Sequence, residues 1–255
     1  MSAPDLLEEI LEAHGGRTRW ELVETISFDL RTGGLLPRTR FPGGGFADAH
    51  VTVNPRERTG VSGPFPGRGR RGVFEDGTVR IETDSGTVLD SRADPRSDFF
   101  GLAGLRRNLR WDPLDATYFA GYALWGYLSF PWILTGSGFE IRRGRDWAVG
   151  PDETWRALEV RFPAGLDAHC AEQIFWIGPD GLLRRNDYTV EVIGRWARAA
   201  HRCERYAEAG GLLFPTRRRV YPRPRNLRAL PGPVLVALDL DRIEVRFAPD
   251  AGGAG

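Results

Sequence analysis

The chain has 255 residues, of which 41% are hydrophobic and 27% are charged, and its formal net charge is +1. These values are typical of a globular protein, and they exclude a strong overall attraction to nucleic acid or to an anionic membrane. All 35 basic residues are arginine, which excludes a lysine Schiff base, pyridoxal phosphate attachment and a phosphate-loop lysine.

The cysteines and the first residues predict a cellular compartment. Cys170 and Cys203 are the two cysteines, and they form neither a disulfide framework nor a zinc-binding spacing. The segment 1–9 is acidic and lacks the basic-then-apolar layout of a signal peptide. We therefore expect a cytoplasmic protein with reduced thiols.

The N-terminal part is predicted to contain one helix followed by short strands. An amphipathic helix is expected over 5–13, before two glycines that end it. Asp76-Gly77 and Ser85-Gly86 suit tight hairpin turns, which need residues with positive φ. Alternating and β-branched runs predict strands over 20–28, 50–53, 72–75, 79–83 and 87–92.

The middle of the chain is predicted to be helical, over 97–109 and 113–129. Asp112 followed by Pro113 is typical of a helix start, and Pro131 ends the second helix. No charged residue occurs over 116–139, which is long enough for a transmembrane helix. Its glycines, proline and three tyrosines argue against a span. We expect a helix buried under a sheet or lining a pocket.

The second half returns to strands and completes a mainly β (α+β) fold. We expect one domain over 1–250, a disordered tail at 251–255, and about ten or eleven strands in one curved antiparallel sheet. Such a sheet forms an open barrel, and the helical insertion would cover its concave face. The expected strands here cover 154–162, 172–177, 182–193, 200–208, 212–221, 234–238 and 242–247.

This arrangement resembles the lipoprotein-carrier (LolA/LolB-like) architecture, an unclosed β-barrel with helices plugging its mouth. The resemblance implies an apolar ligand, although those carriers have an export signal, which we do not expect here. Three stretches also resemble a family of uncharacterised bacterial and fungal proteins: Trp111-Asp112-Pro113-Leu114, Tyr118-Phe119-Ala120-Gly121-Tyr122-Ala123-Leu124-Trp125 and Gly181-Leu182-Leu183-Arg184-Arg185-Asn186-Asp187-Tyr188.

Four residues are candidates for acid–base catalysis: His169, Asp187, Tyr188 and His201. They lie on three successive predicted strands, so they would share one patch if the strand register allows it. A histidine would then move a proton and Asp187 would orient it. The alternatives are a metal site, which we do not expect, and a structural role in which Asp187 pairs with a neighbouring arginine.

Aromatic residues of the helical insertion are candidates for binding a ligand. Tyr118, Tyr122 and Trp125 recur at helical spacing and form a stripe, which would either fill the core or line a pocket with polar spots. Trp176 would extend the lining. Trp111 and Asp112 would sit at the pocket mouth, although Asp112 is also a good helix cap.

The densest basic run, which contains Arg217, Arg218 and Arg219, is the last candidate. Strand alternation sends Arg217 and Arg219 to one face and Arg218 to the other. Arg217 and Arg219 would bind an anionic headgroup or protect an edge strand. Nucleic acid is not expected, because no aromatic residues are interleaved with the run.

Two functions remain open. The first is an enzyme that acts on an apolar small molecule by cofactor-free acid–base chemistry, as a cyclase, isomerase or hydrolase. The alternative is a carrier or sensor that binds a lipid-like ligand and leaves it unchanged. The sequence leaves open whether the chain forms a homo-oligomer.

Overall fold

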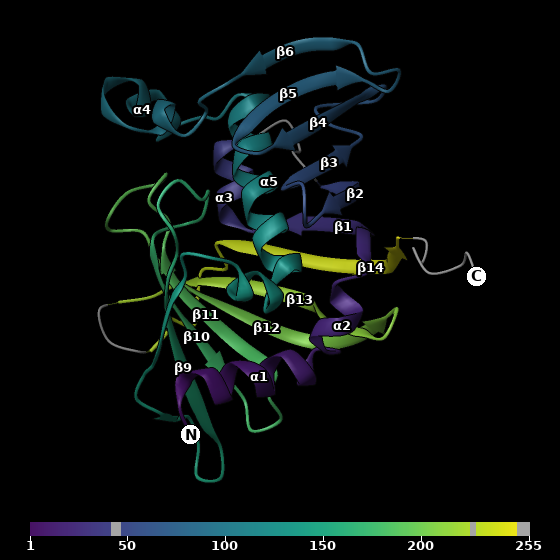
Figure 1. Cartoon of the computed structure of the whole chain (residues 1–255). Coiled ribbons are helices and arrows are strands. Elements are labelled where there is room, and N and C mark those ends of the chain that lie inside the picture. Colours follow the sequence, from purple (N-terminus) through teal and green to yellow (C-terminus); the bar gives the residue numbers. More distant parts are fainter. Residues whose placement is uncertain (42–46, 225–227, 249–255) are drawn as a thin grey trace, which may run out of the picture.

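One antiparallel sheet of 14 strands dominates the computed structural model, which describes residues 1–41, 47–224 and 228–248. The strand order is β6-β5-β4-β3-β2-β1-β14-β13-β12-β11-β10-β9-β7, and β8 pairs with β9 alone. The sheet is curved and does not close (Figure 1). The mainly β fold with an open, curved sheet is therefore confirmed.

The first meander runs from the centre of the sheet to one edge. Its hairpins include the predicted Asp76-Gly77 turn, where both residues have positive φ. The strands are β1 (Val23–Gly33), β2 (Asp48–Asn54), β3 (Thr59–Gly63), β4 (Arg70–Glu75), β5 (Thr78–Thr83) and β6 (Val88–Arg92).

The second meander forms the other half of the sheet and returns to the centre. Its last strand pairs with β1, so one ladder joins the two halves. The strands are β7 (Glu140–Arg143), β8 (Trp147–Ala148), β9 (Thr154–Arg161), β10 (Glu172–Ile177), β11 (Leu183–Thr189), β12 (Arg198–Ala209), β13 (Leu212–Pro222) and β14 (Val236–Phe247).

The strand count is higher than predicted for identifiable reasons. Strand β3 contains Gly60 and Gly63, which weaken its sequence signal. Strands β7 and β8 are only four and two residues long. One difference lowers the count instead. The two strands predicted at the end of the chain are a single strand, which continues through Arg242 at a φ of 50°.

The helices lie at the ends of the sheet and across its concave side. The predicted helix over 97–109 is interrupted at Phe100, which is extended and precedes Gly101 at a φ of 61°. The α-helices are α1 (Ala3–Ala13), α2 (Arg17–Trp20), α3 (Leu35–Arg40), α4 (Gly101–Arg107) and α5 (Pro113–Ser129), and the 3-10 turns are η1 (Ser97–Phe99) and η2 (Trp132–Thr135).

Helix α5 crosses the concave side of the sheet, whose surface toward α5 we call the inner face (Figure 1). The register assigns side chains to the faces, because directly paired residues project to the same side. Asn186, His201 and Val220 are paired across β11, β12 and β13 and lie on the inner face. Asp187 is paired with Ala200 and therefore lies on the outer face.

Among the described residues, no helix is long and apolar enough to cross a membrane. The uncharged run over 116–139 instead supplies α5 and η2. Eleven residues of α5 are buried, including Tyr118, Tyr122 and Trp125. The expected helix under a sheet is thus present, while the predicted tail at 251–255 lies outside the described residues.

Close contact between α5 and strand β4 depends on Gly121. A Cβ atom placed on Gly121 would lie 2.2 Å from Cβ of Phe74, which is buried in β4. The helix can approach the sheet this closely only because glycine has no side chain. Gly126 lies five residues later in the same helix, and a Cβ atom placed on it would have no atom within 4 Å.

We expect Gly121→Ala to lower the free energy of unfolding by about 1–3 kcal/mol, because the methyl group must displace Phe74. The matched variant Gly126→Ala should be neutral or stabilising by up to about 1 kcal/mol, since alanine favours the helix. Urea denaturation of both variants measures the difference. Equal stability of the two variants would contradict this view of the packing.

Candidate functional site

A cavity of about 610 Å³ lies between α5 and the inner face of the sheet. It opens to solvent beside α3 and Trp196, a lining residue that is 75% exposed. Apolar side chains from α5 and from the central strands make up most of its wall, among them Leu30, Ala116, Phe119, Ala120, Val220, Leu238.

Small residues on α5 leave room for this cavity. Ala116, Ala120 and Ala123 lie four and three residues apart, so they share one side of the helix, and all three line the cavity. Neither Tyr118 nor Trp125 lines it. The sequence analysis followed the aromatic stripe, whereas alanines at helical spacing were the signal that marked the cavity side.

The aromatic stripe is tied to the protein by hydrogen bonds. The Tyr118 hydroxyl donates to Asp167 Oδ1 at 2.6 Å, and Trp125 Nε1 donates to the Pro55 carbonyl at 3.1 Å. These contacts anchor α5 to neighbouring loops. Of the other aromatic candidates, Trp111 does line the large cavity.

A group of hydrogen-bonded rings lies at the wall of the cavity, and three of them, Tyr127, His169 and Tyr188, line it. His169 Nε2 lies 2.7 Å from the Tyr127 hydroxyl, and Nδ1 lies 3.1 Å from the Tyr122 hydroxyl. The Tyr127 and Tyr188 hydroxyls are 3.0 Å apart, and Tyr188 lies 3.5 Å from His201 Nδ1. Three predicted residues, His169, Tyr188 and His201, are thus brought together.

Burial keeps this group of rings neutral at pH 7. Desolvation, together with the charge of Arg96, lowers the pKa of His169 to about 3. Burial also holds the pKa of His201 well below its usual value and raises the pKa of Tyr127 and Tyr188. The rings therefore suit hydrogen bonding better than proton transfer.

Asp187 does not join these rings. It lies on the outer face, where its carboxylate accepts hydrogen bonds from Arg185 Nη2 at 2.8 Å and from Trp176 Nε1 at 3.0 Å. Trp176 shares that face and does not reach the cavity. The sequence could not distinguish the faces, because a shift of one residue in the hairpin exchanges them.

The arginine run divides between the faces as alternation predicts. Arg217 pairs with Glu204 and Arg219 pairs with Asp239, both on the outer face and away from the cavity. Arg218 points to the inner face and is only 2% exposed. Arg218 lines only a smaller recess beside the cavity, and the arginines that line the cavity itself are Arg40, Arg198 and Arg223. The sequence analysis had selected none of these four.

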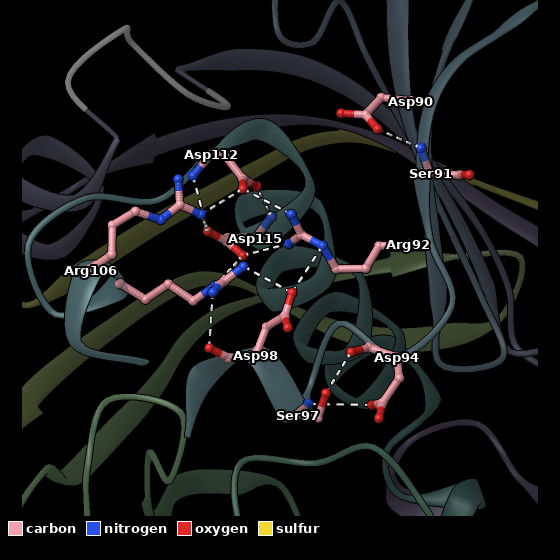
Figure 2. A network of polar contacts seen from close by, with 10 residues as sticks. Asp90, Ser91, Arg92, Asp94, Ser97, Asp98, Arg106, Asp112 and Asp115 are labelled. Atoms are coloured by element: carbon pink, nitrogen blue, oxygen red, sulfur yellow. Dashed lines mark hydrogen bonds and ion pairs between the residues drawn. The ribbon is translucent and has the colours of Figure 1, made fainter. Parts of the chain in front are cut away.

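Asp112 is a helix cap and part of an ion-pair network (Figure 2). Its Oδ1 accepts from the Asp115 backbone N–H at 2.8 Å, and Asp115 Oδ2 accepts from the Asp112 N–H at 3.0 Å. Arg92 bridges both carboxylates, and Arg106 also reaches Asp112. This network fixes the start of α5, and Asp112 does not line the cavity.

No cluster of three or more histidine, cysteine or carboxylate side chains within the described residues has the geometry to hold a metal ion. A metal site at His169 would need carboxylates or further histidines beside it, but the groups bonded to its ring are the hydroxyls of Tyr122 and Tyr127.

Comparison with solved structures identifies the fold. A LolA superfamily protein from Nitrosomonas europaea superimposes with a TM-score of 0.53 at 14% identity, over 100% of this chain and 98% of that chain. The chain has a LolA-like fold. The architecture expected from the sequence is thereby confirmed.

No family model and no curated protein matches the chain. Two further solved structures show weaker similarity than the first. A DUF1329 family protein from Desulfovibrio piger has a TM-score of 0.49 at 12% identity, covering 99% of this chain and 95% of that chain. The lipoprotein LppX from Mycobacterium tuberculosis has a TM-score of 0.26 at 14% identity, covering 74% and 90% respectively.

The buried histidines predict a loss of stability in mild acid. Between pH 6.5 and about 3, unfolded His169 binds a proton that the folded protein excludes, so stability falls as the pH decreases. Each such histidine contributes up to about 1.4 kcal/mol per pH unit. We expect His169→Gln to reduce this slope in urea denaturation between pH 7 and 5, and an unchanged slope would contradict neutral burial.

Proposed function

We propose that the protein binds an apolar small molecule in the cavity beneath α5 and carries or senses it without changing it. The observation that supports this most directly is the cavity itself, about 610 Å³ in volume with a mostly apolar wall. Ligand-binding pockets typically measure about 300–1,000 Å³ and combine apolar walls with a few polar groups. The LolA-like fold agrees with this proposal but does not identify the ligand.

Acid–base catalysis has less support as a second function. It would need a proton acceptor with a pKa near neutrality, whereas burial lowers the pKa of His169 to about 3. It would also need a carboxylate to orient the imidazole, and Asp187 is bonded to Arg185 on the outer face. A carrier or sensor requires neither feature.

Filling the cavity should reduce binding of an apolar probe. We expect Ala120→Trp, which places an indole where the wall is now a methyl group, to weaken binding of the neutral dye N-phenyl-1-naphthylamine by about tenfold, or 1.4 kcal/mol. A fluorescence titration measures both dissociation constants.

The matched control is Ala148→Trp, which adds the same side chain at an exposed position in β8, outside the cavity. This variant should bind the dye as the original protein does. Equal binding by both variants would place the dye elsewhere, and no binding by the unchanged protein would contradict the proposed function.

A further inference from the structure

A small recess of about 40 Å³ adjoins the large cavity on the inner face. Ala123, Tyr127 and His169 line both spaces, so Tyr127 and its neighbours form the boundary between them. The rest of its wall includes five polar residues that do not line the large cavity: Asp167, Gln173, Asn186, His201 and Arg218. The Asp167 carboxylate is already bonded to the Tyr118 hydroxyl and paired with Arg58. A ligand group that extends past this boundary from the cavity would meet these polar residues.

Arg218 is a buried cation without a carboxylate partner among the described residues. Its Nη2 donates to the Tyr127 carbonyl at 3.1 Å, and its Nη1 lies 3.5 Å from Cys203 Sγ. The guanidinium carbon is 5.0 Å from the centre of the Tyr127 ring. Nε has no hydrogen-bond partner in the described structure.

These contacts compensate the charge only in part. The Tyr127 carbonyl belongs to the last turn of α5, where the helix dipole favours a cation, and the ring face adds a cation–π contact. Thiols are weak acceptors, however, and buried cations are normally paired with an anion. The guanidinium thus retains capacity for a negatively charged group.

His201 offers a second donor in the recess. Its ring is fully buried, and Nε2 has no partner within the described chain. When the Tyr188 hydroxyl donates to Nδ1, the neutral ring carries its proton on Nε2. In that tautomer, two N–H groups, from Arg218 and His201, lack acceptors beside the same small space.

We propose that the recess receives the carboxylate of an otherwise apolar acid, whose hydrocarbon chain lies in the large cavity. This inference rests on the proposed function and specifies its ligand class. Arg218 Nε and His201 Nε2 would donate to the carboxylate oxygens, and the ligand would supply the charge that the guanidinium lacks.

Asn186 distinguishes an acid from an alcohol. Its Oδ1 is buried without a partner, while its Nδ2 donates to Gln173 Oε1 at 2.8 Å. A hydroxyl group could donate to this oxygen, which a carboxylate cannot do. The hydroxyl would leave the guanidinium uncompensated, however, and an unpaired buried charge costs more than one unmade neutral hydrogen bond.

Competition between an acid and an alcohol of equal chain length tests this preference. Dodecanoic acid at pH 8 should displace N-phenyl-1-naphthylamine at a concentration about tenfold lower than dodecan-1-ol, as expected for a charge-assisted hydrogen bond. Equal potency, or stronger binding of the alcohol, would overturn the carboxylate proposal while leaving the apolar cavity intact. Failure of the dye itself to bind would instead refute the proposed function.

Replacing the guanidinium should remove the preference. We expect Arg218→Met to bind dodecanoic acid about tenfold more weakly and dodecan-1-ol unchanged. Arg202→Met is the matched control, because Arg202 is exposed on the outer face of the adjacent strand. An unchanged preference in Arg218→Met would show that Arg218 only caps α5.

A second measurement needs no variant and applies even if Arg218→Met does not fold. Dodecanoic acid labelled with ¹³C at the carboxyl carbon reports its own titration by NMR while bound to the protein. Pairing with Arg218 should keep the bound carboxyl ionised at a lower pH than the free acid. A bound carboxyl that titrates at or above the pH of the free acid would overturn the proposal.

Discussion

The cavity exists because α5 contacts the sheet on one side only. At Gly121 the helix comes so close to Phe74 that no side chain fits between them. On another side of the same helix, Ala116, Ala120 and Ala123 are too short to reach the central strands. The ladder between β1 and β14 joins the two halves of the curved sheet beneath this space. An off-centre helix on a curved sheet therefore leaves a mostly apolar space.

Burial keeps the histidine and tyrosine rings around this space uncharged. Desolvation lowers the pKa of His169 to about 3 and raises the pKa of Tyr188 above its usual value. Their hydroxyls and ring nitrogens are largely used on one another. The arginines are the exception, since guanidinium stays charged in any protein environment. Arg218 lines the recess, and Arg40, Arg198 and Arg223 line the cavity. A wall of this kind can orient a ligand by hydrogen bonds and by arginine charges, and it has little means of moving a proton.

The sequence predicted the architecture well and the site only in part. The predicted bounds of the helix over 113–129 agree with the structure, because Asp112, Pro113 and Pro131 mark its ends. The faces of β11 and β13 were not predictable from alternation alone: it separates Asp187 from Tyr188, and Arg218 from Arg219, without saying which side is inner. The Gly178–Gly181 turn permitted more than one register, so the sequence left open whether Asp187 joins the histidines. The structure places Asp187 on the opposite face of the sheet from His201. For helix α5, the spacing of Ala116, Ala120 and Ala123 was the sequence signal that marked its cavity side.

Ligand recovery tests the central claim, that this is a binding protein for an apolar molecule, most directly. The purified protein would be incubated with a total lipid extract, examined by native mass spectrometry, and then denatured so that any released molecule can be identified. The account predicts a mass above that of the polypeptide and recovery of an apolar molecule chemically identical to one in the extract. A bare polypeptide mass under these conditions, or recovery of a chemically altered molecule, would contradict it.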